Sequence, residues 1–159
     1  MIQDLQLSLE LESITQVQFD ADYLWHVLAQ CSNCQEKIED LYCRVSEVQP
    51  IPNSRGEANC VVKCKLCERH AYIKIRSSSD PIIYTSEQSG NYVTVASFDC
   101  RGVILTRWIP ESNQLSAQGV SSNAVYHNLD LNDEFFEYDE GAGVPVSITE
   151  IRHQFVPGR

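Results

Sequence analysis

With 159 residues, of which 43% are hydrophobic, the chain is long enough to bury a sizeable core and too apolar to be disordered throughout. Its net charge of −10 excludes a general affinity for nucleic acid or anionic membrane surfaces, both of which would repel it. No stretch approaches the roughly 20 apolar residues of a transmembrane helix, and the first residues lack the pattern of a signal peptide. The seven cysteines therefore predict a reducing compartment, the cytoplasm or the nucleus.

The beginning of the chain predicts strands that lead to a first cysteine pair. From Leu5 to Leu11 every second residue is leucine and the residues between are polar, which is typical of a strand with one buried face. Asp20–Asp22 indicates a turn, and the aromatic and β-branched run Tyr23–Gln30 leads directly into Cys31. The pair therefore lies at a strand end, where a hairpin turn can carry metal ligands.

Two Cys-x-x-Cys pairs are the strongest signal in the sequence. They comprise Cys31 with Cys34, and Cys64 with Cys67. In each pair a tight turn directs two thiolates and backbone N–H groups at one point. Two such pairs supply the four sulfur ligands of tetrahedral Zn²⁺ at about 2.3 Å. We therefore predict one Zn²⁺ per chain, bound by these four residues.

Strand-like runs also surround the second pair. Gln49–Asn59 is rich in turn-forming residues and predicts a loop, whereas Val61–Val62 leads into the pair and Tyr72–Ile75 leaves it with an alternating pattern. Both pairs thus lie between strands. A redox Cys-x-x-Cys is expected at the start of a helix that follows a strand. Metal binding is therefore favoured over dithiol redox chemistry.

Five basic residues close to the second pair have two explanations. They are Lys63, Lys65, Arg69, Lys74 and Arg76. A zinc ion held by four thiolates is a negatively charged site, so these cations can lower thiol pKa values and stabilise it. They fit a solvated basic face equally well, and the two roles are compatible.

Other potential ligands are less well placed. Cys43, Cys60 and Cys100 are predicted to be small buried thiols, although Cys60 lies close enough to the second pair to replace a ligand. His70 is the one histidine positioned to compete as a ligand. The sequence contains no nucleophile elbow, phosphate-binding glycine loop or dinucleotide fingerprint, and we predict that the protein is not an enzyme.

A boundary between two halves of the chain is predicted near residue 80. Ser77–Pro81 is polar and ends in proline. We expect a zinc-bearing β-rich half, 1–80, and a metal-free β-rich half, 81–159, packed into one compact unit. No long amphipathic helix pattern occurs in the sequence, so the predicted fold class is mainly β.

The second half repeats features of the first. Tyr23 precedes Cys31 by eight residues and Tyr92 precedes Cys100 by eight, each across a strand-like run. The run 144–155 is strand-like as well, but without cysteines. We interpret the pattern as an internal duplication whose second copy has lost its metal, with Cys100 in the place of a former ligand. Two unrelated β-segments would produce the same pattern.

Acidic and aromatic residues are interleaved in Asp133–Glu140, which we call the acidic-aromatic segment. Asn132 or Asp133 can cap a helix, and acidic groups would then lie in its first turn, so the segment predicts a short helix. Phe135, Phe136 and Tyr138 are either contact residues for a basic protein partner or core residues of the second half, with the carboxylates facing water.

Several segments together resemble one family, the small eukaryotic CXXC-motif-containing zinc-binding proteins. The segments that carry the resemblance lie in the family's order along nearly the whole chain: Leu11–Thr15, Cys31–Cys34, Lys63–Cys67, Phe98–Gly102, Tyr138–Glu140 and His153–Val156. The resemblance implies a compact, mostly β protein of two similar halves, with zinc on Cys31, Cys34, Cys64 and Cys67 in the first half. It implies no particular reaction.

The favoured function is a zinc-binding protein with a structural four-cysteine site that acts as a non-catalytic protein-interaction module. Four thiolates close the coordination sphere and leave no open position for a substrate or an activated water. The alternative is a metal-handling protein that exchanges zinc or another soft metal with partner proteins. We expect a monomer with an unidentified protein partner and no interaction with nucleic acid or membranes.

Overall fold

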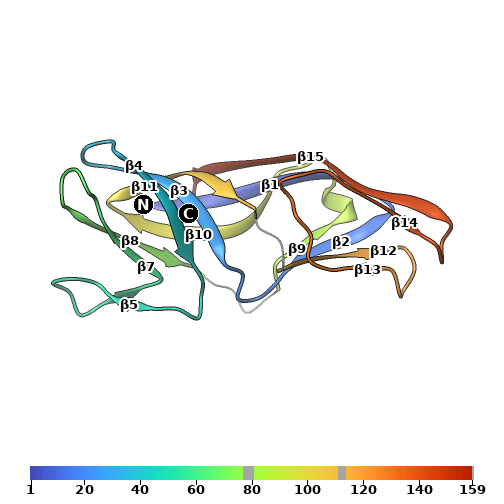
Figure 1. Cartoon of the computed structure of the whole chain (residues 1–159), viewed down its shortest axis with the longest axis horizontal. Helices are drawn as coiled ribbons and strands as arrows, with labels where there is room; N and C mark the ends of the chain where they lie inside the picture. Colours follow the sequence, from blue (N-terminus) through green and yellow to red (C-terminus); the bar gives the residue numbers. More distant parts are fainter. Residues whose placement is uncertain (77–80, 111–113, 159) are drawn as a thin grey trace.

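The computed structural model describes residues 1–76, 81–110 and 114–158. This part of the chain is elongated and consists almost entirely of β-strands, with one 3₁₀ turn, η1 (Ser86–Gln88), and no α-helix (Figure 1). In chain order the strands are β1 (Ile2–Glu12), β2 (Ile14–Phe19), β3 (Trp25–Cys31), β4 (Lys37–Cys43), β5 (Gln49–Pro50), β6 (Glu57–Ala58), β7 (Cys60–Lys63), β8 (His70–Ile75), β9 (Ile83–Thr85), β10 (Val93–Arg101), β11 (Val103–Ile109), β12 (Leu115–Gly119), β13 (Val125–Tyr126), β14 (Phe135–Asp139) and β15 (Val144–Pro157). The predicted mainly-β fold class is confirmed. No described helix is long and apolar enough to cross a membrane.

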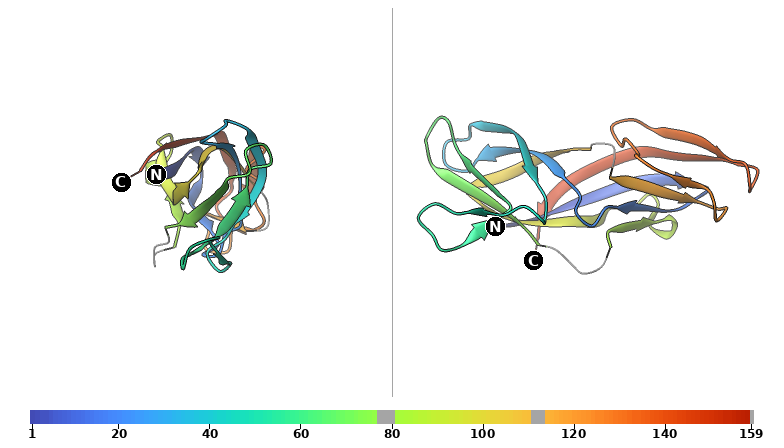
Figure 2. Two further views of the ribbon diagram at one scale, coloured as in Figure 1. Left: turned by 90° about the vertical axis from the view of Figure 1, so that its left-hand side faces the viewer. Right: turned by 60° about the horizontal axis from the view of Figure 1, so that its bottom comes forward.

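One six-stranded sheet runs along the long axis of the molecule. Its order is β14-β15-β1-β10-β8-β7, and its strands pair antiparallel. The long strands β1 and β15 lie side by side along it (Figure 2). A three-stranded sheet, β11-β3-β4, lies at one end of the molecule, and a four-stranded sheet, β13-β12-β2-β9, lies at the other. Strands β5 and β6 form a small separate sheet.

The strand order stays the same when the two halves of the chain are exchanged. Each strand of the first half has a counterpart in the second: β1, β2, β3, β4, β7 and β8 correspond, in this order, to β10, β11, β12, β13, β14 and β15. Exchanging every strand with its counterpart reproduces the order of the six-stranded sheet, read from its other edge, and maps β11-β3-β4 onto β2-β12-β13. The expectation of two similar β-rich halves in one compact unit is therefore confirmed. The halves interlock, because each of the three larger sheets contains strands of both. The predicted boundary at residue 80 lies in the segment 77–80, outside the described residues.

The register of the repeat differs from the one predicted. Strand β3, which ends at Cys31, corresponds to β12, whereas β10, which carries Cys100, corresponds to β1. Cys100 therefore does not take the place of a former ligand, and that prediction was wrong. The physical reason is that hydrogen-bonded strand pairing defines equivalent positions, and one tyrosine-to-cysteine spacing does not report on that pairing.

The core lies where the three larger sheets meet. The alternating leucines of β1 from Leu5 to Leu9 are fully buried, as their sequence pattern predicted. In the middle of the molecule the ring of Phe19 lies 5.5 Å from that of Trp25 and 6.1 Å from that of Trp108, centroid to centroid. Phe19 belongs to the four-stranded sheet and both tryptophans belong to the three-stranded sheet. This aromatic junction therefore joins the two ends of the molecule through packed apolar surface.

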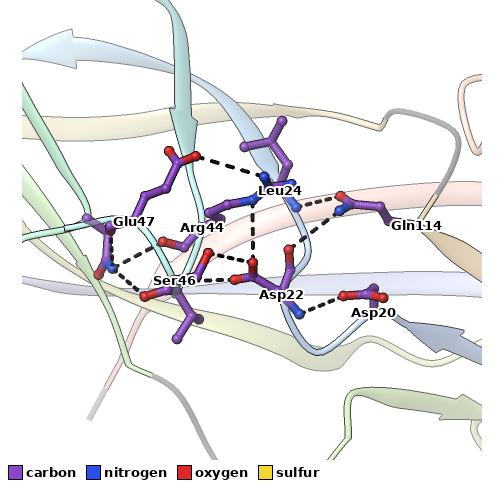
Figure 3. A network of polar contacts seen from close by, with 9 residues as sticks. Asp20, Asp22, Leu24, Arg44, Ser46, Glu47 and Gln114 are labelled. Carbon is purple, nitrogen blue, oxygen red and sulfur yellow. Dashed lines mark hydrogen bonds and ion pairs between the residues drawn. The ribbon is translucent and has the colours of Figure 1, made fainter.

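A polar network fixes the turn before β3 to the loop after β4 (Figure 3). The side chain of Asp20 accepts a hydrogen bond from the N–H of Asp22 at 2.8 Å, which forms the predicted turn. The Asp22 carboxylate accepts hydrogen bonds from the N–H and the hydroxyl of Ser46, at 2.9 and 2.6 Å, and lies 3.7 Å from the Arg44 guanidinium. The Ser46 contacts and the Arg44 charge hold the pKa of Asp22 below its usual value. The network thereby anchors the hairpin that carries the first cysteine pair.

The acidic-aromatic segment contains a strand, and the predicted short helix is wrong. Phe135–Asp139 form β14, the edge strand of the six-stranded sheet, paired with β15. Asp139 at its end is buried, whereas Phe136 and Tyr138 are exposed. Pairing with β15 outweighs the local charge pattern, because a short helix gains too little from capping and dipole interactions to be stable alone.

Candidate metal centre

The two cysteine pairs lie in turns of the same geometry. The carbonyl of Cys31, the last residue of β3, accepts a hydrogen bond from the N–H of Gln35 at 2.9 Å. After β7, the carbonyl of Cys64 accepts one from the N–H of Glu68, also at 2.9 Å. Gln35 and Glu68 both adopt the left-handed conformation, with φ of 64° and 63°. Each local sequence thus forms a tight turn at a strand end, as predicted.

The fold brings the four predicted ligands together. Their Sγ atoms all lie within 4.8 Å of one another. The Sγ of Cys31 is 3.7 Å from that of Cys67, and the Sγ of Cys34 is 3.5 Å from that of Cys64. Four sulfur atoms placed tetrahedrally about 2.3 Å from a zinc ion are about 3.8 Å apart. The donor set and its spacing therefore fit a zinc ion.

Each turn contributes one buried and one partly exposed thiol. Cys31 and Cys64 are 3% and 2% exposed, whereas Cys34 and Cys67 are half-buried. Both turns lie at one tip of the long axis (Figure 1). A metal ion held by the four thiols is therefore shielded on its inner side and lies close to solvent on its outer side.

Hydrogen bonds from the turns favour the thiolate form of two ligands. The N–H groups of Cys34 and Asn33 hold the pKa of Cys31 below its usual value. The N–H of Arg69, together with the Asn33 side chain, lowers the pKa of Cys67 to about 6. Deprotonated thiols are the form that binds zinc. Sequence reasoning missed Asn33, and its position inside the first Cys-x-x-Cys pair is the signal that could have indicated it.

The other candidate ligands stay apart from the centre. Among the described residues, the cluster of potential metal ligands contains neither Cys60 nor His70. Cys43, Cys60 and Cys100 are buried, as predicted. Cys60 and Cys100 both pair with Ile73, from opposite sides. These three cysteines are part of the hydrophobic core.

Residues 4–156 match the model of the family described as CXXC motif containing zinc binding protein, eukaryotic. The chain belongs to this family. A CXXC motif containing zinc binding protein of Homo sapiens is 36% identical over 156 residues, with 96% of each chain covered. A protein of the same description from Bos taurus is 35% identical over 156 residues, again with 96% of each chain covered. Membership of the CXXC zinc-binding family agrees with a cysteine cluster that fits zinc.

Two solved structures share the fold of this CXXC zinc-binding family member. A crystal structure of C1orf123 superposes with a TM-score of 0.86 at 34% sequence identity, covering 98% of this chain and 99% of that one. A hypothetical protein from Plasmodium falciparum superposes with a TM-score of 0.85 at 22% identity and the same coverage. The interlocked two-half architecture is therefore not particular to this chain.

Proposed function

We propose that this family member is a non-catalytic protein-interaction module stabilised by one structural Zn²⁺ on Cys31, Cys34, Cys64 and Cys67. Four thiolates complete a tetrahedral coordination sphere, so the ion offers no open position to a substrate or an activated water. In this proposal the protein is a monomer that binds another protein. The net charge of −10 supports a protein partner over nucleic acid or an anionic membrane.

Exposed aromatic side chains on the edge strand β14 carry the proposal. Phe136 and Tyr138 are 66% and 54% exposed, and they share one face because they are two positions apart in a strand. Phe135 lies on the opposite face, where it is half-buried with its ring 5.4 Å from that of Tyr126. Aromatic side chains dominate binding energy at interfaces. In this proposal the face with Phe136 and Tyr138 contacts the partner, and the face with Phe135 packs against the core.

Carboxylates on the same face define the chemistry of the partner. Ser147 of β15 pairs with Phe136 on one side and with Glu12 of β1 on the other, so the three residues form one row across the sheet. Glu10 and Glu12 are exposed and line a cavity of about 330 Å³. A partner segment with a Lys or Arg side chain in this cavity and an apolar side chain on the aromatic residues satisfies both features.

Selection from a random-peptide library on the immobilised, zinc-loaded protein tests the proposal. We expect enriched peptides to combine Lys or Arg with apolar residues, and to bind the Phe136→Ala/Tyr138→Ala variant at least about tenfold more weakly. Val48→Ala is a matched control, since Val48 is 58% exposed in the loop between β4 and β5. Enrichment of acidic peptides, or equal binding to the double variant, would contradict the proposal.

A second candidate function, metal exchange with partner proteins, is favoured by the exposure of the outer thiols. Cys34 and Cys67 are half-buried at the tip of the molecule, and Leu66, inside the second pair, is 63% exposed. A partner thiol can approach ligands in this position and displace them one at a time. A four-cysteine site that serves structure alone does not require this access, whereas metal exchange does.

Zinc transfer kinetics separate the two functions. Under metal exchange, transfer to an apo peptide with four cysteines accelerates as the peptide concentration rises, because ligand replacement needs direct contact. Under a purely structural role, the transfer rate is independent of the acceptor and equals the rate of spontaneous release to a chelator. Leu66→Ala serves as the contact variant and Val48→Ala as its control, since both side chains are exposed.

A further inference from the structure

The tip of the molecule opposite the metal centre is also built from two turns. One joins β12 to β13 and the other joins β14 to β15, and both lie at the far end of the long axis (Figure 1). The exchange that relates the two halves places the first of these turns on the β3–β4 turn and the second on the β7–β8 turn. The far tip therefore occupies the position of a second metal centre in the repeat.

The strand register assigns the first pair of equivalent positions. Cys31 pairs with Val103, the first residue of β11, and Gly119 pairs with Ile14, the first residue of β2. Cys31 donates its N–H to the carbonyl of Glu36 at an N···O distance of 2.8 Å. Gly119 likewise donates its N–H to the carbonyl of Ala124, also five positions later, at 2.6 Å. Gly119 is therefore the counterpart of Cys31.

The second turn matches in both hydrogen bonding and backbone conformation. The carbonyl of Cys64 accepts a hydrogen bond from the N–H of Glu68 at 2.9 Å, and that of Asp139 accepts one from Gly143 at 2.7 Å. Glu68 and Gly143 are both left-handed, with φ of 63° and 67°. The counterparts of the four ligands, in chain order, are Gly119, Ser122, Asp139 and Ala142.

A buried carboxylate links the two turns at the far tip. Asp139 is 1% exposed, and its oxygens accept hydrogen bonds from the hydroxyl and the N–H of Ser121 at 2.6 and 2.9 Å, and from the N–H of Ala142 at 3.1 Å. Ser121 belongs to one turn, and Asp139 and Ala142 belong to the other. A Cβ added to Gly119 would lie 3.1 Å from the nearer Asp139 oxygen, so position 119 faces the carboxylate.

We infer that the far tip is a second copy of the zinc-binding turn pair in which the Asp139 carboxylate has replaced the metal ion as the link between the turns. The replacement explains why the counterpart of Cys31 is a glycine. A side chain there would meet Ala124 at 2.9 Å as well as the carboxylate. It also explains how the N–H groups of the turns are satisfied without a metal-bound thiolate, because they donate hydrogen bonds directly to the carboxylate.

The Asp139 link also supports the proposed contact face of Phe136 and Tyr138. Asp139 ends β14, the strand that carries Phe136 and Tyr138. Because the carboxylate holds this end without a metal, the face stays formed when zinc is lost from the other tip. The metal centre and the proposed contact face therefore operate independently.

Restoring the ligands tests the equivalence directly. In the full chain, the variant Gly119→Cys/Ser122→Cys/Asp139→Cys/Ala142→Cys should bind about two equivalents of Co²⁺, with a second set of tetrathiolate absorption bands, against about one for the wild type. The same four positions changed to serine provide the matched control and should bind about one. A folded four-cysteine variant with reactive thiols that still binds about one equivalent overturns the inference.

A turn graft keeps the test decisive if the point variants do not fold. It replaces residues 119–124 by the sequence of 31–36 and residues 139–144 by that of 64–69, so that each transplanted turn keeps its own neighbours. The graft should fold on addition of Co²⁺ and bind about two equivalents. A graft that folds with about one equivalent, or that remains unfolded with excess Co²⁺, shows that the two tips are not equivalent.

The role of the carboxylate is tested separately by Asp139→Asn. We expect the melting temperature to fall by more than about 5 °C, with hydrogen exchange accelerated in residues 119–124 and metal content unchanged. Unchanged exchange in this turn would contradict the link. Ser122→Ala, on an exposed neighbouring position in the same turn, is the control.

Discussion

The two tips of this molecule are built on one strand framework and held together by different chemistry. At one tip four thiols converge on a point that fits zinc, beside the exposed cations Lys63 and Lys65. At the other, one carboxylate accepts hydrogen bonds across the turns, and Glu140 occupies the position that corresponds to Lys65. A metal link can be removed by a chelator or a competing thiol, whereas a carboxylate link forms whenever the chain folds. The framework therefore supplies the two turns, and the residues in them decide how the turns are linked.

Metal removal should produce the largest difference between the tips. We expect the protein purified without chelators to carry about one zinc per chain, and Cys31→Ser or Cys67→Ser to unfold the metal tip. The binding free energy of structural zinc, on the order of 10 kcal/mol, is largely folding free energy in such sites. Hydrogen exchange should accelerate in β3, β4, β7 and β8 while β14 and β15 stay protected. Less than about half an equivalent of zinc by elemental analysis, or unchanged exchange in the Cys31→Ser variant, would contradict this. Ser32→Ala, exposed in the same turn, is the control.

The aromatic junction should couple the stability of the two tips, whereas metal removal is expected to affect one tip alone. Trp108 is fully buried and lies 6.1 Å from Phe19 and 6.0 Å from Trp25, ring centroid to centroid. We expect Trp108→Ala to lower the free energy of unfolding by about 3–5 kcal/mol and to accelerate hydrogen exchange at both tips. Ile104→Ala, on the same strand but 38% exposed, should change it by no more than about 0.5 kcal/mol. Loss of protection at one tip alone would show that the junction does not connect them.

Within the far tip, the two faces of β14 should respond differently. Phe135 packs against the core and Phe136 is 66% exposed. Phe135→Ala should lower the free energy of unfolding by about 1–3 kcal/mol, and Phe136→Ala by less than about 0.5 kcal/mol. Denaturant unfolding of both variants measures the difference. An equally large loss for Phe136→Ala would place this residue in the core and remove the proposed contact face.

Acid pH should remove the contribution of the carboxylate link to stability, which is the smallest of these effects. The Ser121 hydroxyl and the N–H groups of Ser121 and Ala142 lower the pKa of Asp139 below its usual value of 3.8. A lowered carboxyl pKa contributes stability that is fully present above the unfolded-state pKa and is lost as the pH falls through the folded-state pKa. The difference in melting temperature between wild type and Asp139→Asn should therefore be constant from about pH 7 to 5 and shrink below pH 3.8. A difference that vanishes near pH 6 would argue that another group is responsible.

Much of the metal centre was predictable because its parts are local. A Cys-x-x-Cys turn is closed by a hydrogen bond between residues four positions apart, so the sequence of a single turn is enough to form it. Strands such as β1 were predictable for a similar reason, since the alternation of Leu5, Leu7 and Leu9 records which side of the strand is buried. The four-cysteine cluster and the mainly-β fold class followed from these patterns.

The equivalence of the two tips could be decided only by the tertiary structure. Equivalent positions such as Cys31 and Gly119, or Cys64 and Asp139, hold different residue types. An alignment of the two halves by residue type therefore does not pair them. The Asp139 link depends on Ser121, which lies 18 residues away along the chain and is brought close only by the folding of two hairpins. Local residue patterns set the turns and the buried faces of the strands. Which turns meet, and whether metal or carboxylate joins them, is set by long-range strand pairing that local patterns do not contain.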